Sequence, residues 1–143
     1  MKAVFVTGGA GYIGSHTVRA LRRRGFEVTV FDNLSSGRRE LVGDARLVVG
    51  DLRDREAVRA ALAAAPYAAV LHFASLIQVG ESYADPRKYY EHNLISSLNL
   101  LGAMLESGPR AFLFSSTAAV YGVPEAVPIR EDHPLRPVNP YGR

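Results

Sequence analysis

The stretch KAVFVTGGAGYIG, residues 2–14, determines which fold is expected for the chain. Residues 2–7 form a short apolar run typical of a buried strand, and glycines spaced as GxxGxxG follow at once at Gly8, Gly11 and Gly14. Such glycines permit a tight turn, let backbone N–H groups approach a pyrophosphate, and let the next helix pack close to the sheet. Because a glycine triplet alone also fits a purely structural turn, its context decides its meaning.

The second strand pattern, residues 27–32, supplies that context because it ends in Asp32. An acidic residue about 20 positions after the glycine turn accepts hydrogen bonds from the adenosine ribose of a dinucleotide. Its carboxylate would repel the extra phosphate of NADP, so the sequence predicts NAD as the cofactor. Arg38 and Arg39 lie close enough to serve that phosphate, but we interpret them as solvated loop charges.

Strand and helix patterns alternate along the whole chain. Further strand patterns occupy 46–51, 68–74 and 110–116, and helical patterns occupy 12–24, 53–64 and about 86–107. In the first helix, Ile13, Val18 and Leu21 are expected on the inner face. Short strands joined by helical crossovers predict an α/β, Rossmann-type doubly wound parallel sheet, whose ligands bind beyond the carboxyl ends of its strands.

Composition and charge limit the classes of function. The 143 residues suffice for one domain, and a net charge of +3, from 17 Lys and Arg against 14 Asp and Glu, argues against nucleic-acid binding. The chain has no cysteine and no signal-peptide pattern, so we expect a cytoplasmic protein without a membrane partner. Its four histidines lack metal-ligand spacing, which predicts no metal site and a buried, hydrogen-bonded His72.

A series of motifs in a fixed order is more specific than any one of them. The series is TGGAGYIG (7–14), DNLSSG (32–37), GDLRD (50–54), HFASLIQVGES (72–82), YYEHN (89–93), FSSTAAVYG (114–122) and NPYGR (139–143). With these motifs the chain resembles the extended short-chain dehydrogenase/reductases, and within them the UDP-glucose 4-epimerases. The resemblance covers the whole chain and implies an NAD-binding Rossmann domain over residues 1–143, incomplete at its C-terminal side.

The resemblance implies two catalytic residues. In that family a Tyr-x-x-x-Lys pair lies on the helix after the fifth strand, with a serine or threonine just beyond the strand. Tyr141 and Thr117 match the tyrosine and the hydroxyl residue, and the lysine would fall beyond Arg143. A free phenol has a pKa near 10, and a neighbouring ammonium favours the phenolate. We therefore expect the substrate domain to be absent and this chain to be inactive alone.

The resemblance also assigns residues to the parts of bound NAD. With the glycine turn and Asp32 included, the implied cofactor set is Gly8, Gly11, Tyr12, Ile13, Gly14, Asp32, Asn33, Ser36, Gly37, Asp51, Leu52, Phe73, Ala74, Ser75, Asn93 and Ser115. Asp51 and Leu52 would contact the adenine, and Asn33 and Ser36 would lie near the adenosine ribose and phosphate. Asn93 would hold the loop near the pyrophosphate.

The implied reaction is the interconversion of UDP-galactose and UDP-glucose. Hydride would leave C4 of the sugar for NAD and return to the opposite face, while Tyr141 and Thr117 would exchange the O4 proton. A related nucleotide-sugar dehydratase or decarboxylase, and an NAD-binding module without chemistry, are the alternatives. Dehydratases place an Asp-Glu pair where this chain has Ala118 and Ala119, which argues against dehydration.

The long helix around residues 86–107 has two possible roles. The resemblance implies that it helps to build a homodimer. Its YYEHN aromatics could contact such a partner or pack in the core, and core packing is the commoner outcome. The sugar that the parent protein would epimerise is not determined by these residues.

Overall fold

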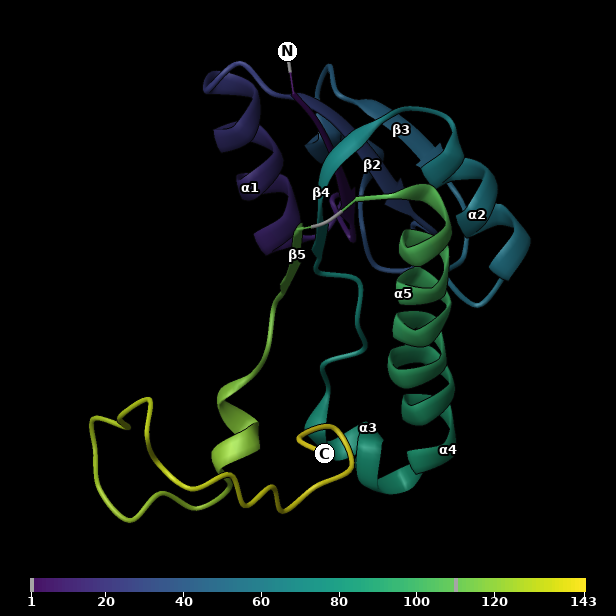
Figure 1. Ribbon diagram of the computed structural model, residues 1–143. Helices are drawn as coiled ribbons and strands as arrows, with labels where there is room; N and C mark the ends of the chain where they lie inside the picture. Colours follow the sequence, from purple (N-terminus) through teal and green to yellow (C-terminus); the bar gives the residue numbers. More distant parts are fainter. Residues whose placement is uncertain (1, 110) are drawn as a thin grey trace.

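The computed structural model describes residues 2–109 and 111–143, which contain a parallel sheet in the order β3-β2-β1-β4-β5 (Figure 1). The strands are β1 (Ala3–Thr7), β2 (Glu27–Asp32), β3 (Arg46–Val49), β4 (Tyr67–His72) and β5 (Ala111–Phe114). The α-helices are α1 (Tyr12–Arg23), α2 (Arg55–Ala63), α3 (Val79–Ala84), α4 (Pro86–Tyr89) and α5 (Ser96–Ser107). A π-helical segment, η2 (Tyr90–Ile95), joins α4 to α5, and η1 (Arg39–Val42) and η3 (Ala118–Tyr121) are 3-10 turns. The predicted doubly wound parallel fold is confirmed.

Two apolar clusters lie on opposite faces of the sheet because strand side chains alternate in direction. Phe5, Val70 and Leu100 belong to the cluster beneath α2 and α5, and Phe5 packs against Phe31 and Tyr67. The other cluster, beneath α1, contains the valines Val4, Val6, Val18, Val28 and Val30. Helices on both faces therefore leave the strand ends as the place where polar side chains can gather.

The inner face of α1 begins at Gly14 rather than at Ile13. Gly14 and Val18 are buried, whereas the side chain of Ile13 is 59% exposed, so the expectation for Ile13 is wrong. Gly14, Val18 and Leu21 are spaced four and three residues apart and share one stripe, and Ile13 lies about 100° around the helix from Gly14. A Cβ on Gly14 would lie 2.8 Å from Gly9 Cα, so glycine is what allows this close approach.

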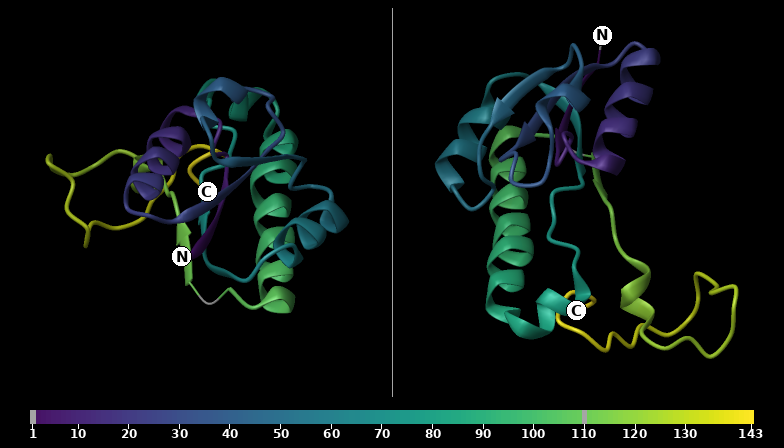
Figure 2. Two further views of the ribbon diagram at one scale, coloured as in Figure 1. Left: turned by 90° about the horizontal axis from the view of Figure 1, so that it is seen from above. Right: turned by 180° about the vertical axis from the view of Figure 1, so that it is seen from behind.

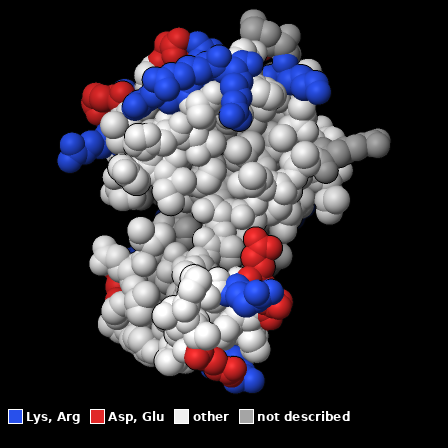
Figure 3. Space-filling view, turned by 90° about the vertical axis from the view of Figure 1, so that its left-hand side faces the viewer, with Lys and Arg blue, Asp and Glu red and all other residues white. Residues whose placement is uncertain are grey.

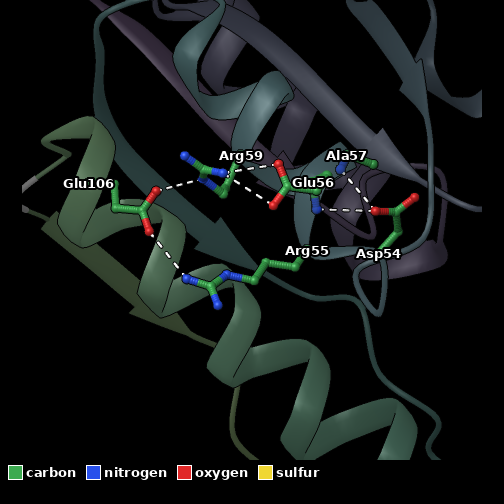
Figure 4. Close-up of polar contacts among 6 residues, drawn as sticks. All are labelled: Asp54, Arg55, Glu56, Ala57, Arg59 and Glu106. Atoms are coloured by element: carbon green, nitrogen blue, oxygen red, sulfur yellow. Dashed lines mark hydrogen bonds and ion pairs between the residues drawn. The ribbon is translucent and has the colours of Figure 1, made fainter.

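An ion-pair cluster joins α2 to α5 on the outside of the molecule (Figure 4). Glu106 accepts from Arg59 Nε at 2.6 Å and from Arg55 Nη2 at 3.4 Å. Arg59 also pairs with Glu56 on its own helix, and the Asp54 carboxylate caps α2 by accepting from the amides of Glu56 and Ala57. These contacts fix the N-terminal half of α2, which follows the loop after β3.

The long helix was predicted as one stretch and is continuous, but it changes pitch at η2. After β5 the chain leaves the sheet, forms an irregular segment, and returns so that its last residues lie beside α3 (Figures 1 and 2). Tyr83 of α3 donates its hydroxyl to the Val138 carbonyl at 2.5 Å. The predicted strand at 110–116 is observed as Ala111–Phe114, and Arg110 lies outside the described residues.

Candidate functional site

The glycine turn connects β1 to α1 and is shaped by two close backbone approaches. Gly8 has a φ of 69°, and a Cβ there would lie 2.7 Å from the Phe73 carbonyl carbon. Its amide donates to the Phe31 carbonyl at 2.9 Å, so the turn is tied to β2. Among the residues that the structure describes, no side chain caps α1 at Gly11, and the first turn holds no acidic residue. The amides and positive dipole end of α1 are therefore free to face an anion.

Asp32 lies where the sequence predicts it, at the carboxyl end of β2. The residue is 8% exposed, and its two carboxylate oxygens accept from the Ala10 amide at 3.0 Å and the Leu34 amide at 2.8 Å. These bonds join the glycine turn to the loop that follows β2. A carboxylate has about four acceptor positions, so roughly two remain for ribose hydroxyls.

The loop after β2 brings Asn33, Ser36 and Gly37 to the same edge. Asn33 and Ser36 are exposed, and Asn33 Nδ2 donates to Asp51 Oδ2 at 3.2 Å. Gly37 packs on the glycine turn, because a Cβ there would lie 2.8 Å from the Ala10 Cβ. Asn33 after β2 and Asp51 after β3 are thus in direct contact.

Asp51 and Leu52, after β3, differ in what they could offer a ligand. Arg53 binds Asp51 through Nε at 3.0 Å and Nη2 at 2.7 Å, and this pairing holds the pKa of Asp51 well below its usual range. The side chain of Leu52 is buried in the core, so only its backbone can face an adenine. Asn99 Nδ2 donates to the carbonyls of Leu52 and Arg53 at 3.0 and 3.1 Å, which fixes this loop to α5.

The loop after β4 carries Phe73, Ala74 and Ser75, and Asn93 holds it in place. The amide of Leu76 donates to Asn93 Oδ1 at 2.9 Å, and Asn93 Nδ2 donates to the Leu76 carbonyl at 3.0 Å. Phe73 and Ala74 are half-buried and Ser75 is exposed. The geometry fits the loop-holding role that the motifs imply for Asn93.

Ser115, Thr117 and Tyr141 follow β5. The Ser115 amide donates to the His72 carbonyl at 3.1 Å, and Thr117 Oγ1 accepts from the Ala119 amide at 3.1 Å as the cap of η3. Tyr141 is half-buried, in a turn closed by the Gly142 amide, which donates to Asn139 Oδ1 at 2.7 Å. A Cβ on Gly142 would lie 2.6 Å from the Ala119 carbonyl oxygen, so the turn carrying Tyr141 packs on η3.

A series of buried hydrogen bonds centred on His72 lies beneath these loops, and the sequence predicted only part of it. His72 is 3% exposed and contacts Thr7 Oγ1 through Nδ1 at 2.6 Å and Ser97 Oγ through Nε2 at 2.9 Å. Burial lowers the pKa of His72 to about 4. The prediction that His72 is a buried, hydrogen-bonded core histidine is confirmed. Thr7, Ser97 and Asn99 were missed, although for Ser97 and Asn99 a polar residue within the mostly apolar helix α5 is a usable signal.

A groove runs along α1, starting at the first turn that follows the glycine turn. It has a volume of about 520 Å³ and is lined by Tyr12, Ile13, His16, Thr17, Ala20, Leu21, Arg24 and Leu71. On this side of the molecule Lys and Arg gather at one end, and the middle is largely uncharged (Figure 3). Tyr12 and Ile13, which the resemblance assigns to the cofactor, lie in the first turn of α1 and are 80% and 59% exposed.

Comparison with known proteins identifies the family. The model of the NAD dependent epimerase/dehydratase family matches residues 4–143. The chain belongs to this family. The UDP-glucose 4-epimerase of Rhizobium meliloti (strain 1021) is 50% identical over 140 residues, which are 98% of this chain and 43% of that relative. The predicted resemblance to UDP-glucose 4-epimerases is therefore confirmed, and the chain spans less than half the length of this relative.

Solved structures of family members show the same fold. UDP-glucose 4-epimerase from Brucella ovis in complex with NAD has a TM-score of 0.96 at 41% identity, covering 99% of this chain and 44% of that one. UDP-glucose 4-epimerase from Bifidobacterium longum in complex with NAD⁺ and UDP has a TM-score of 0.93 at 38% identity, covering 99% and 45%. Within the described residues, no helix is both long and apolar enough to cross a membrane.

Proposed function

We propose that this chain is the cofactor-binding part of an NAD-dependent epimerase that interconverts UDP-galactose and UDP-glucose. The observation that carries the proposal is the meeting of the loops after β1, β2, β3 and β4 at one edge of the sheet, joined by Asp32, Asn33 and Asn93. Parallel α/β sheets bind dinucleotides at this edge. The solved relative from Brucella ovis, which has the same fold, is in complex with NAD.

The residues present fit NAD. A side chain at Gly8 would collide with the backbone after β4, so glycine is what lets the turn pack this closely against that loop. The uncapped first turn of α1 would hold the pyrophosphate, Asp32 the adenosine ribose, and the Asp51 loop the adenine. NAD would supply the group that accepts a hydride from C4 of the sugar and gives it back. The Asp32 carboxylate supports NAD over NADP because it would repel a ribose phosphate.

Tyr141 and Thr117 would move the proton of the sugar O4. The turn of Tyr141 packs on η3, which Thr117 caps, so both hydroxyl residues lie on adjoining segments. A threonine hydroxyl both donates and accepts, which suits a relay between O4 and a tyrosine base. Support for a UDP-sugar substrate comes from the relative that binds UDP.

Residues 1–143 alone should not catalyse this reaction. The lysines of the chain are Lys2 and Lys88, and Lys88 is paired with Glu81. A tyrosine base needs a nearby cation to favour its phenolate form. We therefore place the activity, and the contacts to uridine and sugar, in the whole protein.

We also infer a homodimer that uses the long helix. Tyr90, Leu94, Leu98, Leu101 and Leu105 share one side of η2 and α5, and their exposed fractions run from 38% to 89%. Tyr89, by contrast, is buried, so the two aromatics of YYEHN have different surroundings. An apolar stripe of this kind is typical of a helix that packs against a partner.

A Tyr141→Phe variant of the full-length protein tests the catalytic assignment. Loss of the phenol oxygen should lower kcat by about 10²- to 10⁴-fold, because proton transfer to a positioned base is removed. The NAD content of the purified protein should not change, since the ring is retained. Tyr67→Phe, at a buried tyrosine in the core, is the matched control.

Two results would count against the proposal. If Tyr141→Phe kept the activity of the unaltered protein, another group would carry the proton. If the full-length protein bound NAD but did not interconvert the two UDP-sugars, the binding-only alternative would replace the epimerase.

A further inference from the structure

A buried tyrosine, Tyr89, lies between the loop after β4 and the turn that carries Tyr141. Tyr89 ends α4, and its side chain is 2% exposed. Its hydroxyl accepts from the Gln78 amide at 2.9 Å and donates to Glu81 Oε2 at 2.9 Å. Burial and the adjacent Glu81 carboxylate raise the pKa of Tyr89, so the hydroxyl keeps the proton that it donates.

The hydroxyl of Tyr89 gives the loop after β4 a second anchor. Asn93 already holds this loop at Leu76, two residues before Gln78. Glu81 is itself held by Lys88, whose Nζ lies 2.5 Å from Glu81 Oε1. Residues of the continuous helix α4–η2 therefore fix the loop at both Leu76 and Gln78.

The ring of Tyr89 contacts the other segment. The rings of Tyr89 and Tyr141 meet edge to face, with centroids 6.3 Å apart and planes at 75°. Beside them, the Tyr83 hydroxyl binds the Val138 carbonyl, and Asn139 closes the turn. In Figure 1 the last residues of the chain lie against α3, next to α4. The Tyr89 side chain thus joins the loop after β4 to the turn that carries Tyr141.

We propose that Tyr89 is a positioning residue that sets Tyr141 relative to the loop after β4. This inference rests on the proposed function, because it takes Tyr141 as the group that moves the proton. Catalysis depends steeply on such placement, and an error of about 1 Å can cost about 10²-fold in rate. Simple core packing would explain the buried ring of Tyr89 but would not require both hydrogen bonds of its hydroxyl.

The test uses Tyr89→Phe in the full-length protein, with Tyr67→Phe as the control. Tyr67 is buried too, at 5% exposure, but its hydroxyl has no hydrogen-bond partner among the described residues. Tyr89→Phe keeps the ring contact and loses both hydrogen bonds. We expect kcat to fall about 10- to 100-fold, with KM for the UDP-sugar changed less than about twofold. Tyr67→Phe should leave both values unchanged.

A second measurement does not depend on activity. Hydrogen exchange at the Gln78 amide should become faster in Tyr89→Phe, because its acceptor is gone, and stay the same in Tyr67→Phe. Glu81→Ala leaves Tyr89 in place and should also lower kcat and speed exchange at the Gln78 amide, as in Tyr89→Phe. This second variant covers the case in which Tyr89→Phe does not fold. Unchanged kcat in Tyr89→Phe and Glu81→Ala, or an equal loss in Tyr67→Phe, would overturn the inference.

The two proposals can fail separately. If Tyr141→Phe is fully active, the catalytic assignment fails, whereas faster exchange at Gln78 in Tyr89→Phe would still show that Tyr89 anchors the loop. If Tyr141→Phe is inactive and Tyr89→Phe keeps full kcat, only the positioning role is lost.

Discussion

His72 shows how one buried side chain can hold several functional loops. Ser97 Oγ donates to the Asn93 carbonyl at 2.6 Å, so it must accept from His72 at Nε2. The hydrogen-bond network therefore assigns the proton to Nε2 and leaves Nδ1 to accept from Thr7. Thr7 ends β1 and Asn93 holds the loop after β4. Neutral His72 thus connects Thr7, just before the glycine turn, to Ser97 and Asn93 of the long helix. Asn93 in turn anchors the loop after β4.

This network predicts an acid-sensitive stability. Burial lowers the pKa of folded His72 to about 4, whereas the unfolded value is near 6.5. Between these values the unfolded chain binds more protons, so the free energy of unfolding should fall as pH drops from about 6.5 toward 4. By about pH 5 the loss from His72 should be about 2 kcal/mol. Well above pH 6.5, from about pH 7.5, both states are neutral and His72 adds no pH dependence.

Urea unfolding of the full-length protein at about pH 7 and about pH 5 measures this effect. His72→Gln should lack the His72 share of the difference, and His16→Gln, at an exposed position, should retain it. If His72→Gln kept the full pH dependence, other groups, such as His92, whose pKa burial also lowers, would be its cause.

At the scale of elements, the sequence was most informative where strands end. The second apolar run placed Asp32 at the carboxyl edge of the sheet, and the resemblance assigned Asp51 and Ala74, which also follow strands, to the same edge. Helix α3 was missed because six residues are too few to show a helical period. The side-chain bonds of Asn99 and Tyr89 could not be predicted, since they depend on how α5 and α4 sit over distant loops.

The contact between α2 and α5 allows packing and ion pairs to be compared. Leu62 is 1% exposed in the core beneath these helices, whereas Arg59 and Glu106 are exposed on their outer side (Figure 4). Leu62→Ala should lower the free energy of unfolding by about 2–5 kcal/mol, because it leaves a cavity. Glu106→Gln should cost much less than Leu62→Ala, since exposed ion pairs are screened by water. Chemical denaturation of both variants measures the difference, and a larger loss in Glu106→Gln would show that the ion pairs dominate.

At the scale of the molecule, β5 and the long helix each expose several apolar side chains. The strand β5 exposes Phe112, Leu113 and Phe114, by 37–56%, and the side of η2 and α5 exposes the stripe that contains Leu98. These surfaces lie on different elements, so charge introduced on one should not affect the other. This separation makes the proposed dimer testable by a single substitution.

Leu98→Lys should convert the full-length protein from dimer to monomer. Leu98 is 57% exposed at the middle of the stripe, so the folded protomer loses little by the change, but a lysine within a closed apolar interface would be desolvated without a partner. Sedimentation velocity over a range of concentrations measures the effect. Leu41→Lys, in η1 and away from the stripe, is the control and should remain dimeric. A Leu98→Lys protein that stays dimeric would move the interface elsewhere, and an unaltered protein that is monomeric would remove the dimer from the proposal.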